Sequence, residues 1–341
     1  DWFRLIESSA GEAQRLGMEA WLYDEDRWPS GWAGGAVPLA DSSFRTKWLL
    51  RLPAGERPPD DGGATLLAEG SSGERYYRYV SPLGQAWFSG TSYADLMDRR
   101  AMRTFIDAAY EPYAARFGAD FGGLIPAIFT DEPAITFLPA YCDVPRGMLF
   151  WTDELPERFL SQHGYALPPR MAELFEDVGD YTATRTDFYR TCAWLFEHHF
   201  SRQLGEWCRA HGIALTGHYM LEGSLAANLA WDVCTLPHYR HMDWPGIDHL
   251  GRQVEEVITG LGCRSVVNQY GKSRMSSELY GCAGQHISFE DRKWIAEQQI
   301  ILGVNLLVPH LLLYTMAGER KRDYPCNMWY QQPWWPLNGV V

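Results

Sequence analysis

Four short apolar stretches of the chain each end in an acidic or imidazole side chain, and this repeat constrains the fold most. The strand-like runs end at Asp24, Glu132, His218 and Glu278, with helical patterns between them. Alternating strands and helices are typical of parallel βαβ units. In a (β/α)8 barrel the carboxyl ends of all strands meet on one face, where catalytic side chains gather. The pattern therefore predicts a TIM-barrel-like α/β fold with these four side chains on one face.

An open doubly wound sheet would also bring strand ends together. Such sheets normally carry a glycine-rich phosphate turn, and the sequence contains neither G-x-G-x-x-G nor a Walker motif. We therefore expect residues 1–341 to form one barrel domain. Within it, residues 44–90 break the alternation, and strand-like runs between Gly, Pro and Asp turns predict a small antiparallel β insertion.

Periodicity and capping residues place the remaining elements. Ser92 is a candidate N-cap for the helix that follows it, and Gly212 a candidate C-cap for the long helix before it. Strands are predicted at 18–23, 124–129, 213–217, 264–268 and 304–308, and helices at 1–16, 93–117, 154–163, 169–177, 184–210, 250–261 and 289–302.

Aromatic side chains make up 14% of the chain, and many of the 15 Trp lie beside Gly, Pro, Asp or Gln. Trp28-Pro29-Ser30-Gly31 and Asp243-Trp244-Pro245-Gly246 are loop contexts, where rings form walls for sugars, bases or peptides. The net charge of −13 argues against a nucleic-acid partner, which would need clustered Lys and Arg. No apolar run reaches the roughly 18–20 residues of a membrane span, so no membrane partner is expected.

Glu132 and Glu278 occupy equivalent positions after two separate strands. Cleavage of a glycosidic bond needs one protonated carboxyl to donate to the leaving oxygen and one ionised carboxylate to attack or to activate water. A single Glu can equally well cap a helix or pair with an Arg. Two Glu at equivalent strand ends, in a chain rich in aromatic residues, favour the catalytic interpretation.

Three runs, Leu22–Gly31, Phe129–Pro133 and Ser276–Gly281, occur in an order that resembles the catalytic barrel of large bacterial glycoside hydrolases. The group they most resemble is the family 106 α-L-rhamnosidase-like group, and the resemblance extends over nearly all the chain except the 44–90 insertion. It implies that Glu132 is the general acid, that Glu278 is the base or nucleophile, and that cleavage inverts the anomeric centre. No motif fixes the sugar.

The same resemblance implies that the first barrel strand lies before Asp1, so that this chain is a segment of a longer protein with further domains. It also implies a periplasmic or secreted location and an association with Ca²⁺. Asp24, Glu25 and Asp26 offer the hard oxygen ligands that Ca²⁺ prefers, although the sequence itself requires no cofactor and contains no H-E-x-x-H metal motif.

Other polar and aromatic side chains near the strand ends are candidates for binding sugar hydroxyls or rings. Alternatives remain open: a structural role for His218, an ordinary turn at Asn268, and a solvated, salt-bridged turn at Asp24–Asp26. The candidate substrate-binding residues are Asp24, Asp26, Trp28, Asp131, His218, Tyr219, Asp243, Trp244, Asp248, Asn268 and Tyr280.

These observations predict a glycoside hydrolase that acts on oligosaccharide or polysaccharide side chains of plant or microbial origin. The alternative is a carbohydrate-binding barrel that keeps the aromatic wall and has lost catalysis.

Overall fold

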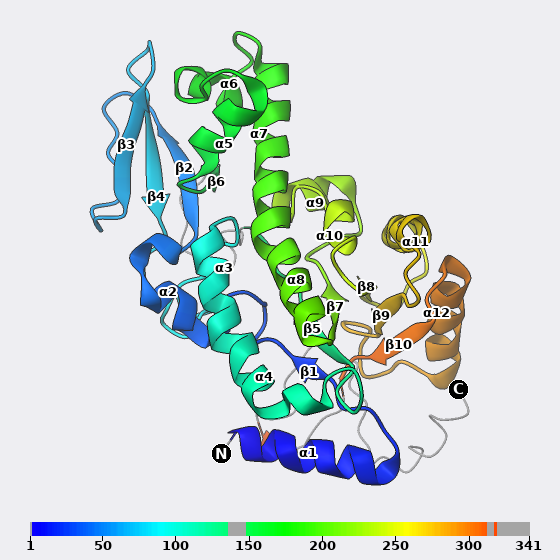
Figure 1. The fold of residues 1–341 in the computed structure, drawn as a ribbon. Coiled ribbons are helices and arrows are strands. Elements are labelled where there is room, and N and C mark those ends of the chain that lie inside the picture. The colour runs from blue at the N-terminus through cyan, green and yellow to red at the C-terminus, as the bar shows by residue number, and fades with distance from the viewer. Residues whose placement is uncertain (1, 136–147, 312–316, 319–341) are drawn as a thin grey trace.

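A parallel β-sheet lies at the centre of the computed structural model, which describes residues 2–135, 148–311 and 317–318 (Figure 1). Its six strands lie in the order β1-β5-β7-β8-β9-β10, and each pair of neighbours is parallel. The strands are β1 (Leu22–Tyr23), β5 (Ala127–Asp131), β7 (Ala214–His218), β8 (Trp244–His249), β9 (Ser276–Leu279) and β10 (Leu306–Pro309).

The sheet curls into a half-barrel, which agrees with a barrel-like α/β fold. The resemblance implied strands 2 to 8 of a (β/α)8 barrel in this chain, whereas the described residues supply six parallel strands, so a clear (β/α)8 barrel is not seen among them. Two glycines allow the strands to approach closely. A Cβ on Gly246 would come within 2.5 Å of the carbonyl oxygen of Gly217, and a Cβ on Gly217 would overlap the backbone of Thr130.

Strand register brings the carboxyl ends of the strands to one edge. Asp131 pairs with His218 across β5 and β7, and Asp248 pairs with Glu278 across β8 and β9. Glu132 directly follows Asp131. The side chains predicted to share one face therefore do so, apart from Asp24.

Helices surround the sheet, and two long helical segments, α3–α4 and α7–α8, lie along one side (Figure 1). A π-helical turn at Ile106–Tyr110 joins α3 to α4, and another at Glu197–Ser201 joins α7 to α8. The helices are α1 (Trp2–Leu16), α2 (Ala36–Ala40), α3 (Arg99–Phe105), α4 (Glu111–Phe117), α5 (Leu155–His163), α6 (Met171–Phe175), α7 (Tyr181–Phe196), α8 (Arg202–His211), α9 (Leu225–Trp231), α10 (Leu236–Tyr239), α11 (Ile258–Tyr270) and α12 (Phe289–Leu302).

Capping residues explain where several helices begin and end. Gly212 adopts a left-handed φ of 71° and ends α8, as predicted. Ser92 does not begin the next helix: the carboxylate of Asp98 accepts hydrogen bonds from the backbone N–H groups of Arg100 and Ala101, so α3 starts six residues later than predicted, at Arg99.

The region between β8 and β9 differs from the sequence prediction. The helix predicted at 250–261 and the strand predicted at 264–268 are both wrong, because a single helix, α11, covers Ile258–Tyr270. Its buried face includes Thr259, Cys263 and Val266, a spacing of four and three residues that fits an α-helix and not a strand. The β-branched pair at 266–267 suggested a strand locally, but packing of the helical face prevails.

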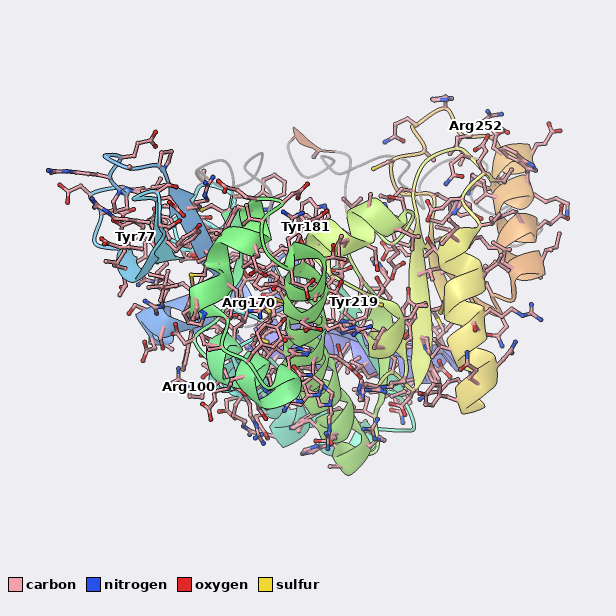
Figure 2. The ribbon with its side chains drawn as sticks, turned by 90° about the horizontal axis from the view of Figure 1, so that it is seen from above. Tyr77, Arg100, Arg170, Tyr181, Tyr219 and Arg252 are labelled. Atoms are coloured by element: carbon pink, nitrogen blue, oxygen red, sulfur yellow. The ribbon has the colours of Figure 1, made fainter. Side chains whose placement is uncertain are left out.

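A second, antiparallel sheet lies beside the half-barrel, with the order β3-β4-β2-β6 (Figure 1). Three of its strands, β2 (Lys47–Leu52), β3 (Ala64–Glu69) and β4 (Arg75–Val80), lie in the predicted 44–90 insertion. The fourth, β6 (Met148–Trp151), was not predicted and pairs with β2 from a later part of the chain. Viewed from above, this sheet, which carries Tyr77, and the loop that carries Arg252 lie on opposite sides of the molecule (Figure 2).

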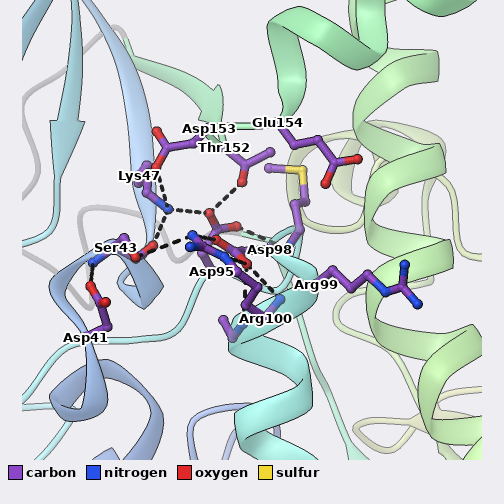
Figure 3. A network of polar contacts seen from close by, with 12 residues as sticks. Asp41, Ser43, Lys47, Asp95, Asp98, Arg99, Arg100, Thr152, Asp153 and Glu154 are labelled. Atoms are coloured by element: carbon purple, nitrogen blue, oxygen red, sulfur yellow. Dashed lines mark hydrogen bonds and ion pairs between the residues drawn. The ribbon is translucent and has the colours of Figure 1, made fainter.

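A buried ion pair connects the small sheet to the half-barrel (Figure 3). The Nζ atom of Lys47 lies 2.7 Å from the carboxylate of Asp95 and donates to the carbonyl oxygen of Ser43. Thr152, next to β6, donates to the same Asp95 oxygen, and the backbone N–H of Met97 donates to the other. Both ionic side chains are almost fully buried, so Asp95 depends on Lys47 for its charge compensation, while Lys47 also lies 3.7 Å from the carboxylate of Asp153.

No helix in the described ranges is long and apolar enough to cross a membrane.

Candidate functional site

Glu132 lies at the carboxyl end of β5, in a backbone conformation that non-glycine residues rarely adopt, with φ of 46°. Its backbone N–H donates to the carbonyl oxygen of His218, and the indole N–H of Trp28 donates to its Oε2 at 2.5 Å. Burial raises the pKa of Glu132 to about 7, against the opposing charge of His218, and the charge of Asp131 raises it further. Near neutral pH a substantial fraction of this carboxyl is therefore protonated.

Glu278, on β9, has the opposite character. The imidazole of His218 donates from Nε2 to its Oε2 at 2.8 Å, and Nε2 of His310 lies 4.0 Å from its other oxygen. Burial alone would raise the pKa of Glu278, but the hydrogen bond and the charges of His218 and His310 outweigh it and lower the pKa below the usual value. The pKa values of the two carboxyls predicted from the sequence are thus shifted in opposite directions, as those of acid and base partners are in enzymes.

His218 is the shared neighbour of the acids at this edge. It is 2% exposed, and its Nε2 also lies 3.6 Å from the carboxylate of Asp131. Burial opposes a positive charge on the ring, yet the hydrogen bond to Glu278 and the charges of Asp248, Glu278 and Asp131 raise the pKa of His218 well above its usual value. The ring is accordingly a buried cation among carboxylates, while its Nδ1 has no hydrogen-bond partner among the described residues.

Asp131 is a third carboxyl at the same edge. The phenol of Tyr23, at the end of β1, donates to its Oδ2 at 2.6 Å, and the Asp131 backbone N–H donates to Ser30. Burial raises the pKa of Asp131 to about 6, against the charge of His218. The sequence did not single out Tyr23, although its place as the last residue of a strand was the available signal.

Asp248 and Glu222 extend the acidic group toward α9. The backbone N–H of Tyr219 and the phenol of Tyr239 donate to Oε1 of Glu222. Burial raises the pKa of Glu222 to about 7, and burial also raises that of Asp248 well above its usual value, each against the charge of His218. Glu222 follows the predicted strand at 213–217 and could be expected to contact sugar hydroxyls or support a carboxylate, but it was not among the predicted site residues.

A cavity of about 530 Å³ opens beside these acids. Glu132 and Asp248 line its inner end, the segment from Tyr219 to Ser224 forms one wall, and the loop from Leu250 to Glu256 forms another. This volume falls within the roughly 300–1,000 Å³ range of small-molecule sites. A ligand in it would contact the raised-pKa carboxyl of Glu132 directly.

Asp24 does not face this cavity, in contrast to the prediction. Its side chain is buried and accepts hydrogen bonds from the hydroxyls of Ser30 and Tyr110, at 2.6 and 2.7 Å. Burial raises its pKa to about 7. Asp24 therefore holds the loop after β1 against the π-helical turn between α3 and α4. Asp26 is exposed and pairs with Arg27, which is the solvated turn considered as an alternative.

The carboxylate of Glu25, between them, is also hydrogen-bonded within the protein. Its two carboxylate oxygens accept hydrogen bonds from the backbone N–H groups of Asp26, Trp32, Ala33 and Gly34, at 2.7–3.1 Å. The Asp24–Asp26 loop thus presents no shared set of free oxygens, and it does not fit Ca²⁺.

Two other sets of side chains place potential ligand atoms within 4.8 Å of one another: Asp131, His218 and Glu278, and Glu132, His218 and Asp248. Both include an imidazole that is already bonded to Glu278, which differs from the all-oxygen shell of Ca²⁺. A calcium requirement therefore stays a prediction from the resemblance.

Asp243 and Trp244 lie at the wrong end of the sheet for substrate contact. Trp244 begins β8 and packs against Trp21 and Arg274, with ring and guanidinium distances of 5.3 and 4.5 Å. The carboxylate of Asp243 accepts from the backbone N–H of Leu215. The Trp-Pro-Gly run indicated an exposed loop, but its glycine serves close strand packing instead, so this prediction is wrong.

The side chains of three more predicted residues are directed elsewhere, although Tyr219 also lines the cavity. Asn268 is exposed on α11 and not beside a strand end. The phenol of Tyr280 donates to the backbone carbonyl of Arg292, and that of Tyr219 lies 2.6 Å from the hydroxyl of Ser201 inside the core. Of the predicted set, the structure brings together Glu132, Glu278, Trp28, Asp131, His218 and Asp248.

The sequence matches no protein-family model and no curated protein. Among solved structures, it is similar to that of a rhamnosidase from Novosphingobium sp. PP1Y, with a TM-score of 0.50 and 17% sequence identity. The similarity covers 71% of this chain and 23% of the rhamnosidase chain. At this identity the likeness concerns the fold alone, which this chain shares in part with that rhamnosidase.

Proposed function

We propose that the chain carries the catalytic site of a glycoside hydrolase, with Glu132 as the general acid and Glu278 as the base. The observation that carries the proposal is the opposite shift of two carboxyl pKa values at one sheet edge: that of Glu132 is raised and that of Glu278 is lowered. The fold shared with a rhamnosidase is consistent with it. Removal of a terminal α-L-rhamnose from a plant or microbial polysaccharide is the specific activity we propose.

In this mechanism Glu132 transfers its proton to the glycosidic oxygen as the bond to the anomeric carbon breaks. Glu278 takes a proton from the water that forms the new bond to that carbon. Trp28 orients the acid through its indole N–H, and His218 keeps the base ionised. The described residues thus supply a proton donor, a proton acceptor and a group that positions each.

Replacement of each carboxyl by its amide tests the assignment. Against a panel of 4-nitrophenyl glycosides that includes α-L-rhamnoside, Glu278→Gln should lower kcat by about 10²–10⁴-fold, the usual contribution of a general base. Glu132→Gln should cause a similar loss on alkyl glycosides and a smaller one on 4-nitrophenyl glycosides, whose leaving group needs little protonation. Glu290→Gln, an exposed change on α12, is the matched control.

Undiminished hydrolysis by both amide variants would refute the catalytic roles. If the unmodified chain binds sugars and cleaves none of the panel, the alternative of a carbohydrate-binding barrel without catalysis is correct.

A further inference from the structure

The cavity beside Glu132 lies on a defined side of the proposed catalytic pair. Its described lining includes the proposed acid, Glu132, and does not include the proposed base, Glu278. In a glycosidase the acid adjoins the leaving group, whereas the base or nucleophile lies across the sugar ring. The cavity is therefore placed to receive the part of the substrate that leaves.

The carboxyl side chains that line the cavity are not offset by basic ones. The described lining contains no Lys, Arg or His. Arg252 is the cation within the loop from 250 to 256, and its guanidinium pairs with Asp291 at 2.6 Å. Because the pKa values of Glu132, Glu222 and Asp248 are raised, these three acids carry only part of a negative charge near neutral pH. Glu255 and Glu256 line the same walls, and a cleft whose charge is only negative repels an anionic ligand. The five acids are Glu132, Glu222, Asp248, Glu255 and Glu256.

The acids also offer hydrogen-bond acceptors to a ligand. No donor in the described part of the chain bonds the carboxylate of Asp248, and Glu132 uses only Oε2 for Trp28. Glu256 accepts from the hydroxyl of Thr259 and lies over Gly223, where a Cβ would come within 2.7 Å of its carboxyl carbon. Hydroxyl groups are the donors that such free acceptors match.

Apolar side chains complete the walls. Leu221 and Leu250 both line the cavity and are 41% and 36% exposed. A sugar unit presents hydroxyl donors at its edge and C–H groups on its faces, so it matches acceptors and apolar walls together.

From these observations we infer that the cavity is a leaving-group subsite that binds a neutral, hydroxyl-rich sugar and rejects uronic acids, with Glu255 and Glu256 providing much of the rejection. The inference rests on the proposed glycoside hydrolase function. It adds the class of the sugar on the leaving side, and it excludes acidic backbones such as polygalacturonate at that position.

Two disaccharides provide the test. Both carry the non-reducing sugar that the chain removes from its 4-nitrophenyl glycoside, and they differ only in the reducing unit, galactose or galacturonic acid. We expect kcat/KM at low salt to favour the neutral disaccharide by about tenfold or more, because like charges in the cleft disfavour the acid. In the Glu255→Gln/Glu256→Gln variant the ratio should fall below about threefold. Glu290→Gln removes the same kind of charge outside the cavity and should leave the ratio unchanged.

Equal kcat/KM for the two disaccharides, or a ratio that the double variant does not move, overturns the inference while leaving the hydrolase assignment intact. If Glu256→Gln impairs folding, Glu255→Gln alone, at an exposed position, is used with a proportionally smaller expected change. If no glycoside is cleaved, the hydrolase assignment fails. Calorimetric titration with galactobiose and digalacturonate then decides whether the cavity binds a neutral sugar. Preferential binding of galactobiose supports the neutral-sugar subsite, whereas equal binding, preference for digalacturonate or no binding overturns it.

Discussion

His218 on β7 and Glu278 on β9 are joined by a 2.8 Å hydrogen bond that passes over the end of β8, the strand between them. The bond pairs a buried imidazolium with the carboxylate proposed as base. It also places the ring beside Asp131, Glu132 and Asp248, whose own pKa values are raised. The imidazolium of His218 thus lies beside both Glu132, the proposed acid that keeps its proton, and Glu278, the proposed base that loses it.

The activity should show a bell-shaped dependence on pH. Glu132 must be protonated and Glu278 ionised, and the pKa of Glu132 is raised to about 7 while that of Glu278 is lowered. We therefore expect kcat/KM to fall about tenfold per unit as pH rises above 7, and to fall on the acidic side only below the ordinary Glu range near 4.3. Rates on the cleaved aryl glycoside from pH 3 to 9 measure both limbs. A profile without an alkaline limb near 7 contradicts the role of Glu132.

Replacement of His218 should move the acidic limb. In His218→Gln the amide can still donate to Glu278, but the positive charge is lost, so burial dominates and the pKa of Glu278 rises. The acidic limb of kcat/KM should then shift upward by about one pH unit or more. His211→Gln, at the end of α8 near the opposite sheet edge, is the control and should leave the profile unmoved. An unchanged acidic limb in His218→Gln would show that His218 has only a structural role.

Glu25 should matter for stability far more than its neighbour Asp26. Glu25→Ala leaves four backbone N–H groups of the following loop without their acceptor, which should lower the free energy of unfolding by about 3 kcal/mol. Asp26→Ala removes an exposed pair with Arg27 and should cost less than about 1 kcal/mol. Urea denaturation followed by Trp fluorescence compares the two variants. Similar costs for both would mean that water replaces Glu25 in the loop.

The Lys47–Asp95 pair should be strongly coupled. Lys47→Met leaves a buried carboxylate without its cation, at a cost of about 3–5 kcal/mol, whereas Lys293→Met breaks an exposed i,i+4 pair with Glu297 and should cost about 0.5 kcal/mol or less. Adding Asp95→Asn to Lys47→Met should recover part of the loss. Additive losses in that double-mutant cycle, again by urea denaturation, would show that the two charges are not coupled.

The sequence identified the acids at the strand ends because their signal is local. An apolar run followed by Glu132, His218 or Glu278 marks the carboxyl end of a parallel strand, and parallel strands bring those ends together. Tyr23 was missed because a contact across the sheet edge, with Asp131, brings it to the site. Glu222 was considered beside His218 and Tyr219 but was not included among the predicted site residues, and its contacts with Tyr239 and Asp248 could not be seen in the sequence.

The errors arose where a local pattern has two structural uses. Gly246 after Trp244 and Pro245 indicated a turn, yet it lies inside β8, where only a hydrogen fits against Gly217. The pair Val266-Val267 within the predicted strand at 264–268 fits a strand or a buried helix face equally well, and contacts distant in sequence decide between them.

The pairing of β6 with β2 has a consequence for how a chain of this kind can be shortened or recombined. Strand β6, which begins at Met148 after Glu132 in the sequence, completes the small sheet. Residues 44–90 alone therefore do not supply all of its strands. Excision of those residues would remove β2 and leave β6 without the strand it pairs with. Exchange of the insertion between homologues would therefore have to carry Met148–Trp151 along with it.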